Sequence, residues 1–180
     1  MSVFAREIVD FWVEAGPERW FAPDPDFDAT TRARFLDPHE AAVRGDLPGW
    51  DETPEGALAL ILLTDQFPRN MFRGQPRAFA SDVFALRIAQ RAIACAFDRA
   101  YQAPLRRFFY LPFMHAEDLA MQKRCEALCA AAGDQEGLEF AIVHREIIEK
   151  FKRFPHRNPI LGRTMSAEEQ AFLDAGGFSG

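Results

Sequence analysis

The chain has 180 residues, which is enough for one domain whose hydrophobic core needs neither metal nor disulfide. Hydrophobic residues make up 48% of the chain and charged residues 27%, a globular composition that excludes a disordered chain. The net charge of −6 argues against nucleic acid or an acidic membrane as a partner, because either would require a basic face.

The first part of the chain predicts two helices. Apolar residues recur at helical spacing over residues 4–14, and the dipeptide Gly16-Pro17 is expected to end this helix. Residues 26–44 predict a second helix. Pro38 lies inside this range and is expected to kink or split the helix, because proline lacks an N–H group.

Thr53 and Pro54 are typical of a helix start, with threonine as the N-cap and proline as the first helical residue. The apolar run over residues 57–63 favours a helix that is buried on nearly all sides. Pro68 is expected to end this helix, because a residue that precedes proline avoids the α conformation.

Later segments predict further helices over 78–100, 104–111, 116–132 and 135–152. Val83 and Phe140 are expected on the buried stripes of the first and last of these. The sequence Ser166-Ala167-Glu168-Glu169 is a capping box, which predicts a short final helix.

About eight helices and no strand are therefore expected, so the fold class is all-α. Short connections between the helices favour antiparallel pairs. We expect one helical domain over residues 1–175 and a frayed tail over residues 176–180.

Three cysteines, at positions 95, 125 and 129, form an odd set without a secretory signal. No apolar run is long enough to span a membrane. We therefore expect a soluble protein in the reducing cytoplasm. Cys125 and Cys129 can share one helix face, but no CxxC spacing accompanies them, and no Gly-rich phosphate loop is present. We expect neither a metal nor a cofactor.

Two stretches share the frame Phe-Pro-(x)-Arg-Asn-x-x-x-Gly. The first is Phe67-Pro68-Arg69-Asn70 with Gly74, and the second is Phe154-Pro155-His156-Arg157-Asn158 with Gly162. Each stretch is expected to join two helices, which suggests two helix–turn–helix halves of similar build. We expect the two turns to lie near each other in space.

Asp65 is expected at the C-terminal end of a helix, where the helix dipole is unfavourable for a carboxylate. An ion pair with Arg69, four residues on, would compensate it, and Asn70 would then be a turn residue. Alternatively, Asp65, Gln66, Arg69 and Asn70 line a pocket. The sequence favours the local pair, because the polar groups of turns usually serve the backbone.

His115, Glu117 and Asp118 precede an expected helix. Acids in the first turn of a helix are ordinary partners of its dipole, but with His115 they could also form an acid–base or metal centre. No HExxH or comparable spacing supports a metal. His144 lies on an apolar stripe and is expected to be a core residue unless His115 or His156 meets it.

Four segments together make a specific pattern over most of residues 4–173. These segments are Phe11-Trp12 with Ala15-Gly16-Pro17-Glu18-Arg19-Trp20-Phe21, Asp65-Gln66-Phe67-Pro68-Arg69-Asn70-Met71-Phe72-Arg73-Gly74, Phe109-Tyr110-Leu111-Pro112-Phe113-Met114-His115-Ala116-Glu117-Asp118-Leu119, and Arg153-Phe154-Pro155-His156-Arg157-Asn158. With them the chain resembles the bacterial domain-of-unknown-function family 924. It departs from the family pattern at Lys152, where glycine is more usual, and at Ala116, where serine is.

The resemblance implies a helical fold similar to that of tetratricopeptide-repeat proteins, and it supplies no accepted activity. It also implies that the polar motif residues form one site. Such a site would be a cationic pocket rimmed by phenylalanines and Tyr110. The expected ligand-binding residues are Asp65, Gln66, Arg69, Asn70, Tyr110, His115, His156, Arg157 and Asn158.

The function we expect is that of a binding module for an anionic small ligand or peptide end, held by its carboxylate or phosphate. One alternative is a small acid–base or metal-dependent hydrolase centred on His115, Glu117 and Asp118 with His144 and His156. Another is a structural protein that oligomerises through its aromatic surface. The sequence leaves open whether the protein is an enzyme and what its oligomeric state is.

Overall fold

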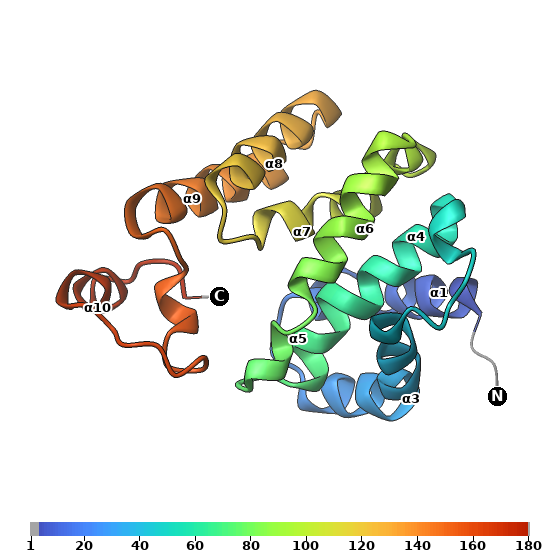
Figure 1. Cartoon of the computed structure of the whole chain (residues 1–180), viewed down its shortest axis with the longest axis horizontal. Helices are drawn as coiled ribbons and strands as arrows, with labels where there is room; N and C mark the ends of the chain where they lie inside the picture. The colour runs from blue at the N-terminus through green and yellow to red at the C-terminus, as the bar shows by residue number, and fades with distance from the viewer. Residues whose placement is uncertain (1–3, 180) are drawn as a thin grey trace. The chain divides into compact units, whose positions relative to one another are not determined.

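The computed structural model describes residues 4–179, which form helices and no strand (Figure 1). The all-α prediction is therefore confirmed. The chain divides into two compact units, one made of Met1–Arg73 with Arg77–Pro112 and the other of Gly74–Pro76 with Phe113–Gly180. The expectation of a single domain with a frayed tail stays a prediction.

The helices of the first unit follow the predicted order. Thr53 caps one of them with its side chain, as expected, and Gly16 ends another with a positive φ of 73°. The α-helices are α1 (Ala5–Ala15), α2 (Pro17–Trp20), α3 (Pro25–Arg44), α4 (Pro54–Ile61), α5 (Phe67–Met71) and α6 (Asp82–Ala94). Short 3₁₀ turns lie at Trp50–Glu52, Pro76–Ala78, Phe97–Ala100 and Leu105–Phe109.

Helix α3 runs without interruption through Pro38, so the expected split is absent. Its start is strongly specified, because the Asp24 side chain accepts hydrogen bonds from the backbone N–H groups of Asp26 and Phe27. Gly45, with φ of 79°, ends it in the left-handed conformation that glycine adopts without strain.

Aromatic rings fill the core of the first unit. The ring of Trp12 stacks on that of Trp20, with centroids 5.8 Å apart, and lies 5.5 Å from both Phe67 and Phe108. The ring of Phe35 packs 5.0 Å from that of Phe67. Contacts of this kind account for part of the unusual phenylalanine content of the chain.

Pro68 does not end the helix that contains it, contrary to the expectation. The chain widens into a π-helical segment over Leu62–Gln66 and continues as α5. The N–H of Phe67 bonds the carbonyl of Leu62, five residues earlier, which makes room for the proline ring.

Side chains from neighbouring helices bond two backbone carbonyls beside this widened turn, five and four residues before Pro68, which has no N–H group to donate. His39 Nδ1 lies 2.8 Å from the carbonyl oxygen of Leu63, and Ser81 Oγ donates to that of Thr64 at 2.6 Å. Because all these groups are buried, an unmade hydrogen bond here would destabilise the fold. The helix that contains Pro68 is therefore stabilised by side chains from α3 and from the residue before α6.

The second unit contains a helix pair. Helix α8 (Leu119–Ala132) and helix α9 (Gln135–Phe151) pack together and are joined by Gly133 and Asp134, of which Asp134 caps α9 (Figure 1). The short helix α7 (Leu111–Met114) precedes this pair and α10 (Ala167–Asp174) follows it. The capping box predicted at Ser166 and Glu169 is confirmed.

Two residues expected on buried stripes are exposed. Val83 has 74% of its surface accessible and Phe140 has 47%. In α9 the buried arc runs through Gly137, Ala141 and His144, so Phe140 lies at its edge. In α6 the buried residues are alanines one helical turn apart, and Val83 falls outside their arc.

The two Phe-Pro turns differ in backbone conformation, although both are followed by a glycine with positive φ. Phe67 and Pro68 lie inside a helix, whereas α9 ends at Lys152, which takes φ of 62°, before Pro155 starts a 3₁₀ turn. Gly74 and Gly162 have φ of 74° and 65°. The shared frame therefore specifies the exit from each turn rather than one common turn.

No helix among residues 4–179 is long and apolar enough to cross a membrane.

We predict that Ser81→Ala lowers the free energy of unfolding by about 1–3 kcal/mol, because the buried carbonyl of Thr64 loses its donor. The loss should shrink in a Pro68→Ala background, where residue 68 regains an N–H group. Urea denaturation of the four proteins of this double-mutant cycle measures the coupling. The exposed Ser179→Ala serves as the control, and equal losses in both backgrounds would refute the explanation.

Candidate functional site

The expected site residues fall in both units. Asp65, Gln66, Arg69, Asn70 and Tyr110 belong to the first unit. The remaining candidates belong to the second, and these are His115, Glu117, Asp118, His144, His156, Arg157 and Asn158. The expectation that the two Phe-Pro turns meet stays a prediction, and each group is described within its own unit.

Asp65 is fully buried at the end of the π-helical segment. Gln66 Nε2 donates to its carboxylate at 2.5 Å, and Arg69 Nη1 lies 3.4 Å from the other oxygen. Arg69 also donates to the backbone carbonyl of Asp65 at 2.5 Å and to both oxygens of Asp82, at 2.9 and 3.1 Å. The local Asp65–Arg69 pair favoured by the sequence is therefore confirmed, and Asp82 extends it to α6.

Electrostatics makes Arg69 the centre of this cluster. Burial alone would lower the pKa of Arg69, but the carboxylates of Asp65 and Asp82 raise it. The guanidinium therefore stays charged and holds two acids. Its N–H groups bond Asp65 and Asp82 and so link α5 to the start of α6, which is a structural role.

Asn70 and Tyr110 are also engaged within the first unit. Asn70 Nδ2 donates to Asp28 at 2.9 Å, and Arg73 binds the same carboxylate through two N–H groups at 2.8 and 3.0 Å. These bonds tie the end of α5 to α3.

Tyr110 is 1% exposed and donates its hydroxyl proton to Asp98 at 2.8 Å, and it accepts from Arg106 at 2.7 Å. Burial and the neighbouring Asp98 raise the pKa of Tyr110. Its hydroxyl therefore stays protonated and locks the chain between the 3₁₀ turns that carry Asp98 and Arg106.

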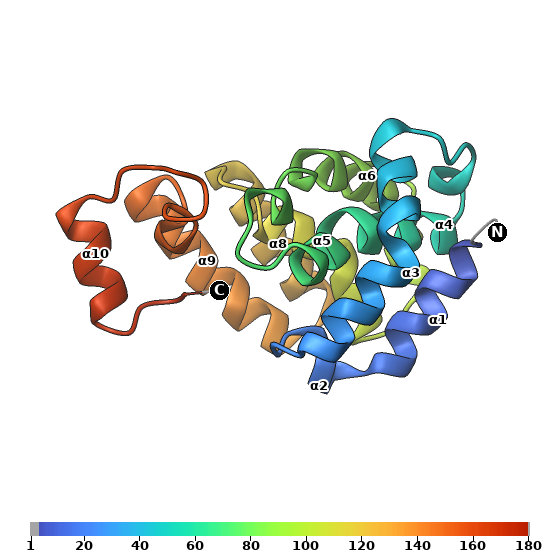
Figure 2. The ribbon, with the colours of Figure 1, turned by 90° about the horizontal axis from the view of Figure 1, so that it is seen from below.

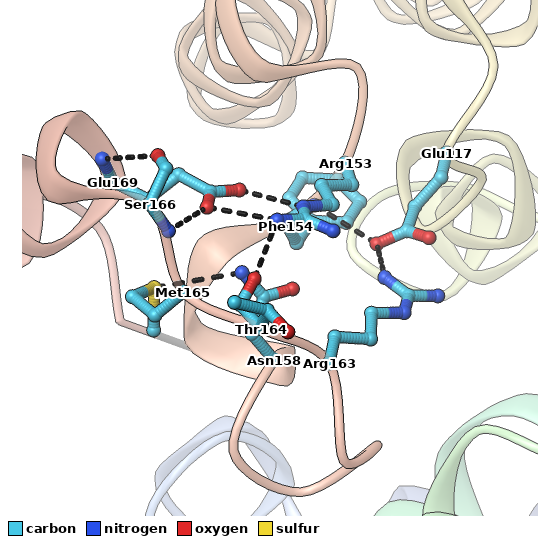
Figure 3. A network of polar contacts seen from close by, with 9 residues as sticks. All are labelled: Glu117, Arg153, Phe154, Asn158, Arg163, Thr164, Met165, Ser166 and Glu169. Carbon is cyan, nitrogen blue, oxygen red and sulfur yellow. Dashed lines mark hydrogen bonds and ion pairs between the residues drawn. The ribbon is translucent and has the colours of Figure 1, made fainter.

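In the second unit Glu117 holds the Phe154 turn in place (Figure 3). Its Oε1 accepts the backbone N–H of Phe154 at 2.9 Å and a guanidinium N–H of Arg163 at 2.8 Å. Burial alone would raise the pKa of Glu117, but these two donors lower it. Glu117 is therefore an ionised carboxylate near neutral pH and is poorly suited as a general acid.

Asp118 is the N-cap of α8, where its Oδ1 accepts from the N–H groups of Ala120 and Met121 at 2.8 and 3.0 Å. This is the dipole partnership that the sequence analysis considered alongside a catalytic role.

Asn158 and Arg153 organise the loop that leads to α10 (Figure 3). Arg153 binds both oxygens of Glu169 at 2.6 and 2.9 Å, and this contact lowers the pKa of that buried carboxyl. Asn158 is fully buried, and its Nδ2 lies 3.5 Å from the sulfur of Met165. Its side chain also helps to lower the pKa of Glu169 by hydrogen bonding.

Histidines of the second unit gather around the buried ring of Phe154. The rings of His144 and His156 lie 5.5 and 5.7 Å from it, and the Arg157 guanidinium carbon lies 4.6 Å from its centroid. Phe178 contacts the same two histidines, at 4.5 and 5.5 Å. His144 and His156 therefore contact the same two phenylalanine rings.

Burial and the neighbouring charged groups both lower the pKa of His144. Burial lowers the pKa of His144 to about 3, and His115, His156 and Arg157 contribute to the decrease as nearby bases. His144 is therefore neutral at pH 7. Its Nδ1 lies 2.8 Å from the carbonyl oxygen of Phe140, so Nδ1 carries the proton and Nε2 is the acceptor nitrogen. We call His115, His144, His156 and Arg157 the histidine cluster.

Within residues 4–179 no group of three or more His, Cys, Asp or Glu side chains is placed to hold a metal ion. The expected absence of a metal or cofactor stays a prediction. Cys125 and Cys129 are buried on α8, where hydrogen bonding between them and burial raise the pKa of Cys125.

Sequence reasoning missed Phe178, Asp82 and Ser81. Phe178 lies in the segment expected to fray, and a phenylalanine in a glycine-rich tail was the available signal. Asp82 and Ser81 lie at the start of α6, and nothing in the sequence pairs them with residues 64–69.

Comparison with known proteins identifies one family. A family model described as "Bacterial protein of unknown function (DUF924)" matches residues 8–177. The chain is also similar to the solved structure of ATU0120, a protein of unknown function from Agrobacterium tumefaciens. The two are 49% identical with a TM-score of 0.92, and the match covers 96% of this chain and 97% of that one. Among curated proteins, no match was found.

We predict that Arg69→Met destabilises the protein by about 3–5 kcal/mol, because Asp65 and Asp82 lose the cation that compensates them. The matched control is Arg73→Met, whose side chain is 43% exposed and pairs with Asp28. It should cost no more than about 1 kcal/mol. Urea denaturation at pH 7 compares them, and similar losses would contradict the structural role of Arg69.

The stability of the protein should fall on acidification partly through His144. Its folded pKa of about 3 lies below the unfolded value of 6.5, so the unfolded chain binds the proton first. Stability is therefore lost as the pH falls from about 6.5 towards 3, by up to about 1.4 kcal/mol per pH unit from this group.

Substituting His144→Phe keeps an aromatic ring against Phe154 and should remove this contribution. Urea midpoints at pH 7, 6 and 5 measure the slope. Val143→Ala, which changes no titratable group, should keep the slope of the original protein. A slope unchanged in His144→Phe would show that the histidine is not buried as a neutral base.

Proposed function

Because the chain belongs to the bacterial protein family of unknown function DUF924, whose description names no activity, we propose a function from its own residues. The protein is a helical binding module, and the histidine cluster of its second unit takes an anionic group. The ligand is a small molecule or peptide end that carries a carboxylate or phosphate.

The gathering of His144, His156 and Arg157 around one phenylalanine ring carries this proposal. Burial is the largest cause of the lowered pKa of His144, and electrostatic repulsion from His115, His156 and Arg157 adds to it. A bound anion would relieve this repulsion. Binding would therefore be favoured by interactions that the protein without ligand cannot make.

The accessibility of the cluster members suits this role. His115 and His156 are half-buried, whereas His144 and Arg157 are each only 6% exposed. A ligand would meet the first two directly. His144 would present its Nε2 acceptor to a protonated oxygen of the ligand, and Arg157 would supply fixed positive charge in a partly dehydrated setting.

The remaining expected ligand residues have structural partners, which narrows the proposed site. Asp65, Arg69 and Asn70 are engaged in ion pairs and hydrogen bonds within the first unit. Asn158 serves the loop before α10. We therefore propose the histidine cluster alone as the binding site.

The hydrolase alternative finds little support in the carboxylates that it requires. Glu117 is held by Phe154 and Arg163, and Asp118 caps a helix. The oligomeric alternative rests on exposed apolar residues such as Phe140 and Val143 on α9. Both alternatives stay predictions.

We propose two finer assignments on the same basis. A tetratricopeptide-repeat-like arrangement is supported by the α8–α9 pair with its two-residue connection. A cytoplasmic location is supported by Cys95, an exposed thiol, which persists best in a reducing compartment.

Anion binding is tested by following the histidine Cε1–H signals in nuclear magnetic resonance during titration with inorganic phosphate and with succinate, at constant ionic strength and pH 6.5. We expect saturable shifts of His115 and His156 with one or both anions. Arg157→Gln should weaken binding by about tenfold or more, because it removes a charge-assisted hydrogen bond.

The matched control is Arg145→Gln, which removes an arginine of the same unit that pairs with Glu126 and Glu149. It should bind as the original protein does. If Arg157→Gln is poorly folded, His156→Gln takes its place. Shifts that never saturate, or equal affinities for Arg157→Gln and Arg145→Gln, would refute the site.

A further inference from the structure

An open groove of about 760 Å³ lies on the first unit between α1 and α3. Its floor is one stripe of α1, because Phe4, Glu7, Phe11 and Glu14 are three or four residues apart and so face the same side. Arg34 of α3 lines the opposite wall. Figure 2 shows the two helices side by side.

A second hollow of about 330 Å³ continues this groove along α1, since it shares Phe11, Glu14 and Arg34 with the first. From residue 4 to residue 14 the stripe is about 15 Å long, at 1.5 Å per residue. Three turns of a partner helix have about this length.

The groove offers apolar surface to a partner. Phe4 is 70% exposed, whereas Phe11 is only 9% exposed. The guanidinium of Arg34 lies over the ring of Phe11, 4.7 Å from its centroid. A helix that laid an apolar face on Phe4 would remove this surface from water.

The charge of the groove indicates the sign of its partner. Four carboxylates and two guanidiniums line the larger hollow. Arg34 pairs with Glu7 at 3.2 Å and Arg6 with Asp10 at 3.6 Å. Glu14 and Glu55 form no ion pair with any residue between 4 and 179. The groove therefore keeps uncompensated negative charge beside the exposed ring of Phe4.

We propose that this groove docks an amphipathic helix of a partner protein, with an apolar stripe flanked by lysine or arginine. The apolar stripe covers Phe4, and the cations reach Glu14 and Glu55. Complementary charge would orient the helix and speed its association. This inference does not rest on the proposed anion site, which belongs to the other unit.

The test uses two fluorescein-labelled 14-residue peptides of leucine, alanine and one charged residue, patterned as amphipathic helices. One peptide carries lysine and the other glutamate. Fluorescence anisotropy with the full chain at low ionic strength should show saturable binding of the lysine peptide alone. Glu14→Lys should weaken that binding by about tenfold or more, because attraction becomes repulsion.

The design protects the fold and controls for net charge. Glu14 lies in the last turn of α1, where the helix dipole favours lysine, so the substitution should not unfold the helix. Glu139→Lys, on the exposed surface of α9, makes the same change in net charge and should bind as the original protein does. Phe4→Ala should also weaken binding.

Three results would overturn the proposal. These are failure of the lysine peptide to bind, equal binding of the glutamate peptide, and equal affinities for Glu14→Lys and Glu139→Lys. Loss of anion binding at the histidine cluster would leave the groove proposal intact.

Discussion

A proline inside a buried helix is the constraint on which the first unit depends. Pro68 removes one backbone donor from the helix. The carbonyls of Leu63 and Thr64 just before it receive hydrogen bonds from His39 on α3 and from Ser81 beside α6, so side chains from two other helices support this turn. The π-helical segment that results also turns the buried carboxylate of Asp65 towards Arg69. A local backbone defect thus explains why polar residues occupy the core.

The second unit accommodates the proline of its Phe-Pro turn in a different way. Its Phe-Pro turn follows a helix that has already ended, so Pro155 costs no helical hydrogen bond. The free N–H of Phe154 is bound by Glu117 instead, and the ring of Phe154 becomes the surface around which His144 and His156 gather. The shared Phe-Pro motif therefore supports the ion pairs of Arg69 in the first unit and the histidine cluster in the second. This difference is why the binding site that we propose lies in the second unit.

Much of the fold could be predicted because it depends on local chemistry. Caps at Thr53 and Ser166 and the positive-φ glycines at 16 and 133 act within one helical turn. The Asp65–Arg69 pair is local in the same sense. The continuation of the helix through Pro68 could not be predicted, because it needs donors 25 or more residues before the proline and 13 after it in the chain. The prediction that Phe140 is buried is wrong for a related reason. The edge of the buried face of a helix depends on which neighbouring element covers that face.

The sequence by itself determined the helical class, most helix ends, the family and the identity of the polar residues, because each depends on spacing along the chain. The tertiary structure decided which of those residues are already engaged. Three of them donate hydrogen bonds to aspartates: Arg69 to Asp82, Asn70 to Asp28 and Tyr110 to Asp98. None of these partners is adjacent in sequence. The physical reason is that a side chain's availability for a ligand depends on the groups that packing brings within hydrogen-bonding distance, and helical periodicity carries no information about them.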